Sequence, residues 1–119
     1  PVELANEIRL PVGEPVQFRL VSDNVIHAFW VPALGGKMDM IPGRTTWLAV
    51  HPTRTGRFAG ACAEYCGTSH AFMRLWVEVL ERPAFETWLA GQAAPAAAPA
   101  TPEAARGLAL LRANGCGAC

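Results

Sequence analysis

The sequence predicts an all-β fold, an antiparallel sandwich or Greek-key barrel, followed by a linker and a short C-terminal helix. Three features lead to this prediction: short apolar runs, alternation of apolar and polar residues within them, and turns that contain proline or glycine between them. Short strands at regular spacing are typical of two packed sheets. The chain has 119 residues, of which 51% are hydrophobic, so it can bury one modest core.

The expected strands follow one another from residue 7 to residue 80. Residues 7–21 predict two strands around a Pro-Val-Gly-Glu-Pro turn, because Val16, Phe18 and Leu20 alternate with polar residues. Residues 73–80 alternate in the same way. Proline and glycine predict a loop after residue 31 and a turn at residues 42–43. The remaining expected elements are strands over residues 25–31 and 45–50 and a helix over residues 83–90, and residues 56–61 lead into the loop that holds Cys62 and Cys66.

The chain changes character after residue 91. Residues 92–102 combine alanine and proline in the run QAAPAAAPATP, which predicts an extended linker. Residues 103–114 then predict a helix rich in Ala, Leu and Arg, which ends at Gly115. We therefore expect a folded domain over residues 1–91, a linker over residues 92–102, and over residues 103–119 the start of a further domain that is truncated here.

The charge and the hydropathy of the chain each argue against one class of interaction. The 10 Lys and Arg residues balance the 10 Asp and Glu residues, so the sequence does not support a nucleic-acid partner, which needs a basic face. No run is long and apolar enough to span a bilayer, which takes about 20 residues. We therefore expect a soluble protein or a soluble piece of a longer one.

The residues with the clearest chemistry lie in one short segment, Cys62-Ala-Glu-Tyr-Cys66-Gly-Thr-Ser-His70-Ala-Phe-Met73. It combines two thiols, an imidazole and a thioether, and soft sulfur ligands with imidazole suit copper. A mononuclear blue-copper site would use two histidines, one cysteine and a weak axial methionine. With His27 as the second histidine, this segment has one cysteine too many.

The extra thiol has three explanations. Cys62 and Cys66 could form a disulfide, one of them could be an inert thiol, or both could bridge two copper ions. Only the third explanation uses every donor. Zinc competes for the same ligand types, but the nearby Met73 favours copper. His51 lies in a turn and is expected to be solvated, and Met38 and Met40 are expected in a loop, as core filling or surface residues.

Three blocks of the chain resemble subunit II of cytochrome c oxidase. Residues 22–32 (SDNVIHAFWVP) resemble the family's first copper-ligand strand, and residues 34–44 (LGGKMDMIPGR) resemble the loop after it. Residues 60–73 (GACAEYCGTSHAFM) resemble its CuA motif. The blocks occur in the family's order, and the resemblance extends over residues 7–89.

The resemblance implies a cupredoxin fold that carries a binuclear CuA centre. Cys62 and Cys66 would bridge the coppers, and His27 and His70 would each bind one. Met73 and the backbone carbonyl of Glu64 would be weak ligands. The Glu64 side chain would also reach Mg²⁺ at the boundary with oxidase subunit I, and only when that subunit is present. Asp39 and Arg44 would face subunit I, near the route to haem a.

The implied function is electron transfer. The domain would accept electrons from a c-type cytochrome and pass them to haem a of subunit I, where oxygen is reduced to water. It would be the electron-entry part of an oxidoreductase and would perform no bond chemistry of its own. The resemblance places it on the periplasmic face of a bacterial cytoplasmic membrane. The family's two N-terminal membrane helices and an upstream aromatic segment precede the region found here.

Two local features modify this picture. The family usually has aspartate directly before the Val-Ile-His block, whereas here Asn24 stands there and Asp23 is one residue earlier. The C-terminal Cys116-Gly-Ala-Cys119 resembles the start of a C-x-x-C-H haem-attachment motif, as in members fused to a c-type cytochrome. Its histidine would follow residue 119, so Cys116 and Cys119 could hold haem c in the full-length protein or be a plain dithiol or disulfide.

Two other functions compete with this one. The CuA domain of nitrous oxide reductase has a similar motif, although residues 41–44 (IPGR) and the C-terminal cysteine pair favour the oxidase. A copper-storage or delivery protein would bind a single Cu(I) through exchangeable ligands. Such a protein would not need His27 packed in a strand.

Overall fold

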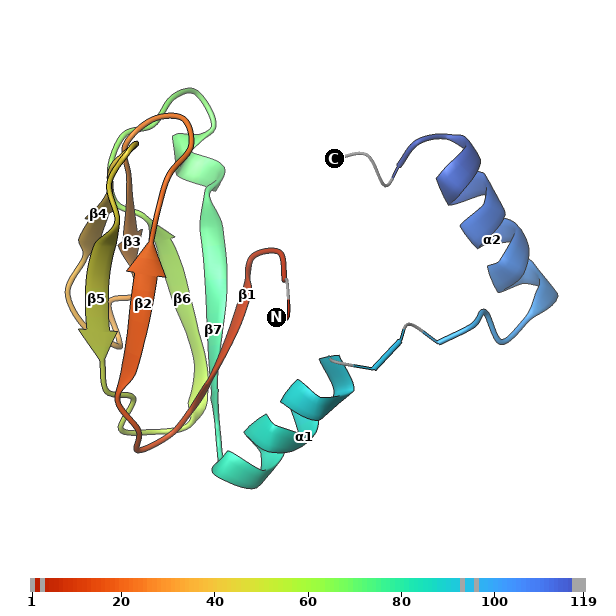
Figure 1. Cartoon of the computed structure of the whole chain (residues 1–119), viewed down its shortest axis with the longest axis horizontal. Coiled ribbons are helices and arrows are strands. Elements are labelled where there is room, and N and C mark those ends of the chain that lie inside the picture. The colour runs from red at the N-terminus through yellow and green to blue at the C-terminus, as the bar shows by residue number, and fades with distance from the viewer. Residues whose placement is uncertain (1, 3, 93, 96, 117–119) are drawn as a thin grey trace.

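The computed structural model describes residues 2, 4–92, 94–95 and 97–116. Its first part is a sandwich of two sheets, with a five-stranded sheet in the order β1-β7-β6-β3-β4 and a two-stranded sheet of β2 and β5 (Figure 1). The strands are β1 (Glu7–Pro11), β2 (Val16–Leu20), β3 (His27–Trp30), β4 (Met38–Met40), β5 (Thr46–Val50), β6 (Gly56–Cys62) and β7 (Arg74–Leu80). The helices are the 3-10 turn η1 (His70–Phe72), α1 (Arg82–Gln92) and α2 (Pro102–Ala113).

The expected strands are all present, and β6 and β4 are additional strands. The loop prediction for Met38 and Met40 is wrong, because they form β4, which pairs antiparallel with β3 and places Met40 opposite His27. Both methionines are half-buried and pack against the core, so the expectation of core filling is confirmed. A strand of three residues between glycines and a proline is too short to show a period in the sequence.

One strand pair departs from the expected antiparallel pairing. β1 pairs with β7 in parallel, with Leu10 opposite Val79, whereas β2 pairs with β5 in the other sheet. The Pro-Val-Gly-Glu-Pro segment therefore joins the two sheets and does not close a hairpin. Gly13 adopts a φ of 77° there, and its N–H donates to the Pro52 carbonyl at 2.8 Å. A positive φ suits glycine, so this corner is locally encoded.

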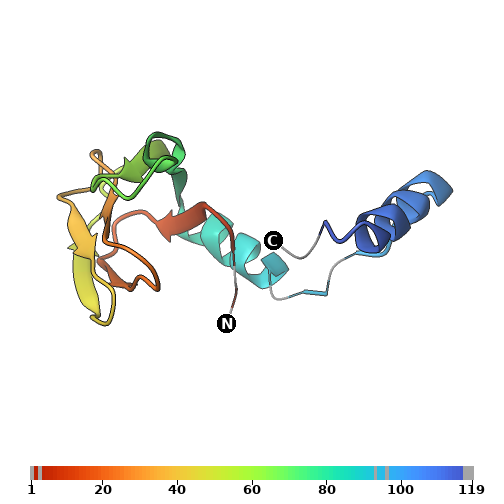
Figure 2. The same ribbon diagram turned by 90° about the horizontal axis from the view of Figure 1, so that it is seen from above.

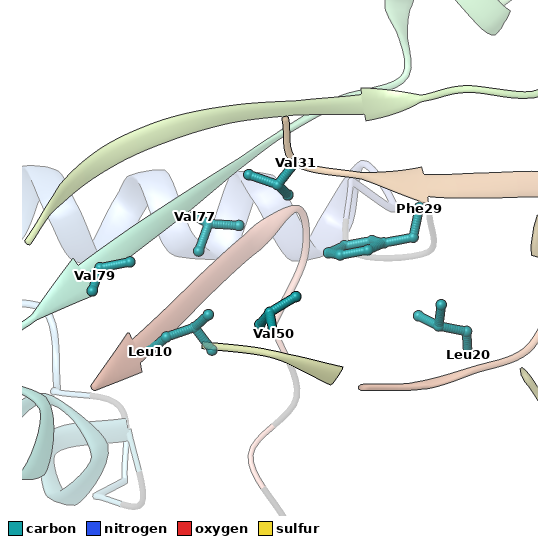
Figure 3. Packing of buried hydrophobic residues seen from close by; sticks show 7 residues of the cluster. All are labelled: Leu10, Leu20, Phe29, Val31, Val50, Val77 and Val79. Carbon is teal, nitrogen blue, oxygen red and sulfur yellow. The ribbon is translucent and has the colours of Figure 1, made fainter. Parts of the chain in front are cut away.

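The core lies between the two sheets. Phe29 of β3 packs on Phe18 of β2, with ring centroids 4.9 Å apart, and so connects the sheets. Val77 and Val79 of β7 are at most 1% exposed, whereas Trp76, which directly precedes Val77, is 45% exposed, which confirms the alternation seen in residues 73–80. Figure 3 shows the buried side chains that meet in this space: Leu10, Leu20, Phe29, Val31, Val50, Val77 and Val79.

Gly60 sets how closely β6 approaches its neighbours. A Cβ at this position would lie 2.7 Å from Leu75 Cδ1 and 2.9 Å from Val31 Cγ2, which is closer than carbon atoms pack. The missing side chain therefore lets β6 lie tightly against the core two residues before Cys62. The same strand end carries the chemistry described below.

The two helices follow the sandwich in different ways. α1 lies beside β1, where the Arg9 guanidinium stacks over the Trp88 ring at 5.0 Å. α2 has no buried residue and lies apart from the sheets (Figures 1 and 2). Thr101 caps α2 by accepting a hydrogen bond from the Ala104 N–H at 3.1 Å. Within the described residues, neither helix has the length and hydropathy to cross a membrane.

Candidate metal centre

The candidate donors come together at one end of the sandwich. Cys62 ends β6, and Met73 directly precedes β7. The loop between them is closed at its base by the Cys62 N–H, which donates to the Met73 carbonyl at 3.0 Å. His27 begins β3, whose antiparallel pairing with β6 places Phe29 opposite Cys62. Strand pairing thus brings a histidine 35 residues away in sequence to the cysteine loop.

The two thiols lie close to each other and to further donors. Cys62 Sγ is 3.8 Å from Cys66 Sγ. The Cys62 thiol donates to the carbonyl oxygen of Glu64 at 3.1 Å, and the Cys66 thiol donates to Met73 Sδ at 3.2 Å. Each sulfur therefore has one weak donor beside it, a carbonyl oxygen on one side and a thioether on the other.

Each thiol also has one imidazole beside it. Nδ1 of His27 lies 3.8 Å from Cys62 Sγ, and Nδ1 of His70 lies 3.5 Å from Cys66 Sγ. The Tyr65 ring lies against the His70 ring, with centroids 5.7 Å apart. The donor set is thus arranged in two similar halves, each with a thiol, an imidazole nitrogen and one weaker donor.

This arrangement fits a metal in both chemistry and spacing. The ligand atoms of His27, Cys62 and Cys66 all lie within 4.8 Å of one another, and the three residues are half-buried. Two metal–thiolate bonds of about 2.3 Å can span the separation of the sulfurs. Thiolate, imidazole and thioether donors together suit copper better than a hard cation.

The other expected site residues lie in different places. Glu64 is exposed, with its carbonyl turned to Cys62. Asp39 lies on β4, one strand beyond His27, and Arg44 lies in the turn after β4; both are exposed. Cys116 is an exposed free thiol after α2, in the part of the chain that lies apart from the sheets. Cys119 lies outside the described residues.

Sequence reasoning missed one polar partner of the cluster. Nε2 of His27 lies 2.9 Å from Oδ1 of Asn24, three residues earlier. Asn24 attracted notice only as a departure from the family pattern. The Ser-Asp-Asn run shortly before His27 could have predicted this contact, because asparagine side chains often hydrogen-bond to nearby groups within turns.

Burial raises the pKa of the Cys66 thiol, and the neighbouring Cys62 thiol and Glu64 carboxylate raise that pKa further. Since the thiolate is the form that reacts, we expect the alkylation rate of Cys66 in the reduced, metal-free chain to rise at higher pH than in the urea-unfolded chain. Mass spectrometry of the Cys66 peptide would measure both profiles. Equal midpoints would contradict this prediction.

The same shift has a consequence for stability. As pH rises past the ordinary thiol pKa, the unfolded chain loses the Cys66 proton before the folded chain does. The free energy of unfolding of the metal-free chain should therefore fall with rising pH across that window. A metal bound at this sulfur would displace the thiol proton, so metal binding should strengthen as pH rises.

The sequence is similar to known proteins along most of its length. A family model described as cytochrome c oxidase subunit II, periplasmic domain, matches residues 1–80. Cytochrome c oxidase subunit 2 of Alkalihalophilus pseudofirmus is 41% identical over 113 residues, which are 95% of this chain and 33% of that protein. Alternative cytochrome c oxidase subunit 2 of Bradyrhizobium diazoefficiens is 43% identical over 86 residues, 72% of this chain and 31% of that protein. The chain spans about a third of the length of these curated relatives.

Solved structures show the same fold. The periplasmic domain of subunit II of cytochrome oxidase from Bradyrhizobium japonicum has a TM-score of 0.70 and 37% identity, and covers 76% of this chain and 66% of its own. A mixed disulfide intermediate between a thioredoxin-like protein and subunit II of cytochrome c oxidase has a TM-score of 0.65 and 38% identity, over 73% of this chain and 61% of that one. A heme-copper terminal oxidase dimer has a TM-score of 0.60 and 28% identity, over 64% of this chain and 52% of that one. The expected cupredoxin-like β fold is confirmed.

Proposed function

Because this chain belongs to the family of the periplasmic domain of cytochrome c oxidase subunit II, we propose that it carries electrons within a haem-copper terminal oxidase. It would accept them from a c-type cytochrome at a binuclear CuA centre and pass them to haem a of subunit I, where oxygen is reduced to water. The observation that carries the proposal is the pair of thiols 3.8 Å apart, each with its own imidazole.

Each donor has a role in this proposal. The thiolates of Cys62 and Cys66 would bridge the metals, and Nδ1 of His27 and Nδ1 of His70 would each bind one of them. The thioether of Met73 and the carbonyl of Glu64 would be the weak ligands. Bound copper would supply a one-electron carrier whose charge is shared between two nuclei.

The strands explain why such a carrier would work in this fold. Cys62 ends β6, His27 begins β3, and the Met73 carbonyl accepts from the Cys62 N–H, so the paired strands fix three of the donors. A site held in this way changes its geometry little when its charge changes. Little rearrangement means a low barrier to electron transfer.

The proposed partners follow from the surroundings of the centre. Asp39 and Arg44 are exposed on and after β4, beside β3, and would face subunit I. The exposed Glu64 carboxylate would bind Mg²⁺ at that boundary when subunit I is present. The full protein would reach the membrane through N-terminal helices upstream of this chain. A thioredoxin-like protein, which forms a mixed disulfide with subunit II in the solved neighbour, would be a further partner of this domain.

The C-terminal part has its own proposal. Residues 1–91 would be the CuA domain and residues 92–102 a linker. Residues 103–119 would begin a fused c-type cytochrome, with Cys116 and Cys119 attaching haem c. The separation of α2 from the sheets supports a unit distinct from the sandwich. A c-type cytochrome, fused or separate, would then be the electron donor.

Reconstitution with Cu(II) tests the central proposal. We expect two coppers per chain, a purple colour, and an electron paramagnetic resonance spectrum in which one electron couples to two copper nuclei. One copper with a blue single-site spectrum would contradict the binuclear centre. A single, readily exchanged Cu(I) would instead indicate a storage or delivery protein. The oxidase subunits among the relatives favour the oxidase over nitrous oxide reductase.

A further inference from the structure

The turn before β3 places an asparagine beside a candidate copper ligand. Nε2 of His27 lies 2.9 Å from Oδ1 of Asn24, and the backbone N–H of Val25 donates to the same oxygen at 2.7 Å. The Ser22 hydroxyl donates to the Val25 carbonyl at 2.6 Å and so braces this turn. One side-chain oxygen thus meets a backbone donor and an imidazole nitrogen.

The backbone donor settles which way the asparagine amide points. A peptide N–H can only donate, so the amide atom that faces Val25 N must be the acceptor oxygen and not the NH₂ group. Ser22 Oγ is 3.2 Å from this oxygen, but its single proton is engaged by the shorter bond to the Val25 carbonyl. The two lone pairs of Asn24 Oδ1 are therefore available for one hydrogen bond from the Val25 N–H and one from the His27 ring.

The oriented amide in turn selects the protonation pattern of His27. Because Asn24 Oδ1 can only accept, the hydrogen bond requires the proton of the neutral imidazole to lie on Nε2. The lone pair is then on Nδ1, the nitrogen that lies 3.8 Å from Cys62 Sγ. The Val25 N–H thus fixes the orientation of the Asn24 amide. The amide in turn fixes which nitrogen of His27 has its lone pair toward the thiols.

We propose that Asn24 is a positioning residue for His27, which holds the ring in the Nε2–H tautomer with Nδ1 toward the thiols. The role in copper binding rests on the proposed function; the tautomer does not. Ligating histidines generally donate their other N–H to an acceptor, and loss of that acceptor typically costs 10–100-fold in metal affinity. A neutral amide performs this task without adding a negative charge beside two thiolates.

The metal-free chain provides the first test. We expect ¹⁵N spectra of the reduced protein, at a pH where its imidazoles are neutral, to show His27 with a slowly exchanging Nε2–H. Asn24→Leu should speed this exchange and make the Nδ1–H tautomer detectable, whereas Asn24→Asp should preserve the wild-type pattern. His70 in the same spectra is the internal reference. An unchanged His27 signal in Asn24→Leu would overturn the proposal whatever metal the protein binds.

Copper affinity provides the second test. We expect Asn24→Leu to weaken copper binding by about 10–100-fold in competition with a chelator, and Asn24→Asp to restore it. Asn24→Asp should also lower the reduction potential, because its negative charge favours the oxidised centre.

Two neighbours are matched controls for these tests. Asp23→Asn changes a charge in the same turn, and Ser22→Ala loosens the turn but keeps the acceptor; both should bind copper as the wild type does. If Ser22→Ala loses as much affinity as Asn24→Leu, the turn and not the amide acceptor matters, and the proposal fails. If the wild type binds no copper pair, the proposed function fails, while the tautomer test still decides the role of Asn24.

Discussion

Cys66→Ser should abolish the binuclear centre. Cys66 Sγ lies close to three other donors, at 3.8 Å from Cys62 Sγ, 3.5 Å from His70 Nδ1 and 3.2 Å from Met73 Sδ. A serine oxygen is a hard, mostly protonated donor and cannot replace a bridging thiolate. We expect at most one copper per chain and the loss of the purple colour and of the spectrum shared by two nuclei.

A second thiol in the chain provides the control for this change. Cys116→Ser removes an exposed thiol outside the cluster, so it should leave copper content and spectra as in the wild type. Copper that binds the folded chain but not the unfolded chain should also raise the unfolding temperature by mass action. Cys66→Ser should make this increase smaller. Unchanged spectra in Cys66→Ser would mean that Cys66 is not a ligand.

Phe29→Ala should be the most damaging single change to the sandwich. Phe29 is 8% exposed, packs on Phe18 across the two sheets, and lies opposite Cys62 in the pairing of β3 with β6 (Figure 3). Removal of a buried phenylalanine side chain costs about 3–5 kcal/mol. Small domains have about 5–15 kcal/mol of stability in total, so this loss is a large share of it.

Urea unfolding of the metal-free protein would measure the loss as a shift of the midpoint. Trp30→Ala is the matched control, because Trp30 is the next residue of β3 but is 39% exposed; its loss should be clearly smaller. We also expect weaker copper binding in Phe29→Ala, since β3 positions His27. Equal midpoints for the two variants would show that Phe29 does not connect the sheets.

Local sequence patterns were sufficient to predict most elements and the ligand cluster. The alternation over residues 73–80 predicted β7 and its buried face, because a strand turns successive side chains to opposite sides. The run from Cys62 to Met73 indicated a soft-metal site because its donors are near one another in the chain. Proline and glycine marked the turns correctly. Each of these signals depends on neighbours within about a dozen residues.

The pairing of distant segments could not be predicted in this way. The Pro-Val-Gly-Glu-Pro corner resembles a hairpin turn in sequence, yet it sends β1 beside β7 and β2 beside β5. The three residues of β4 have no readable period and become a strand only because β3 offers them hydrogen-bond partners. Which strands pair depends on core burial across the whole domain, and that information is not local.

The sequence therefore determined which residue types can bind the metal and on which strands they lie. Only the tertiary structure decided that His27 Nδ1 lies 3.8 Å from Cys62 Sγ, so that each of the two thiols has its own imidazole. The physical reason is that the spacing of two residues along the chain does not fix the distance between them in space. Donor chemistry belongs to each side chain, but ångström-scale contacts between residues far apart in the chain exist only once β3 has paired with β6.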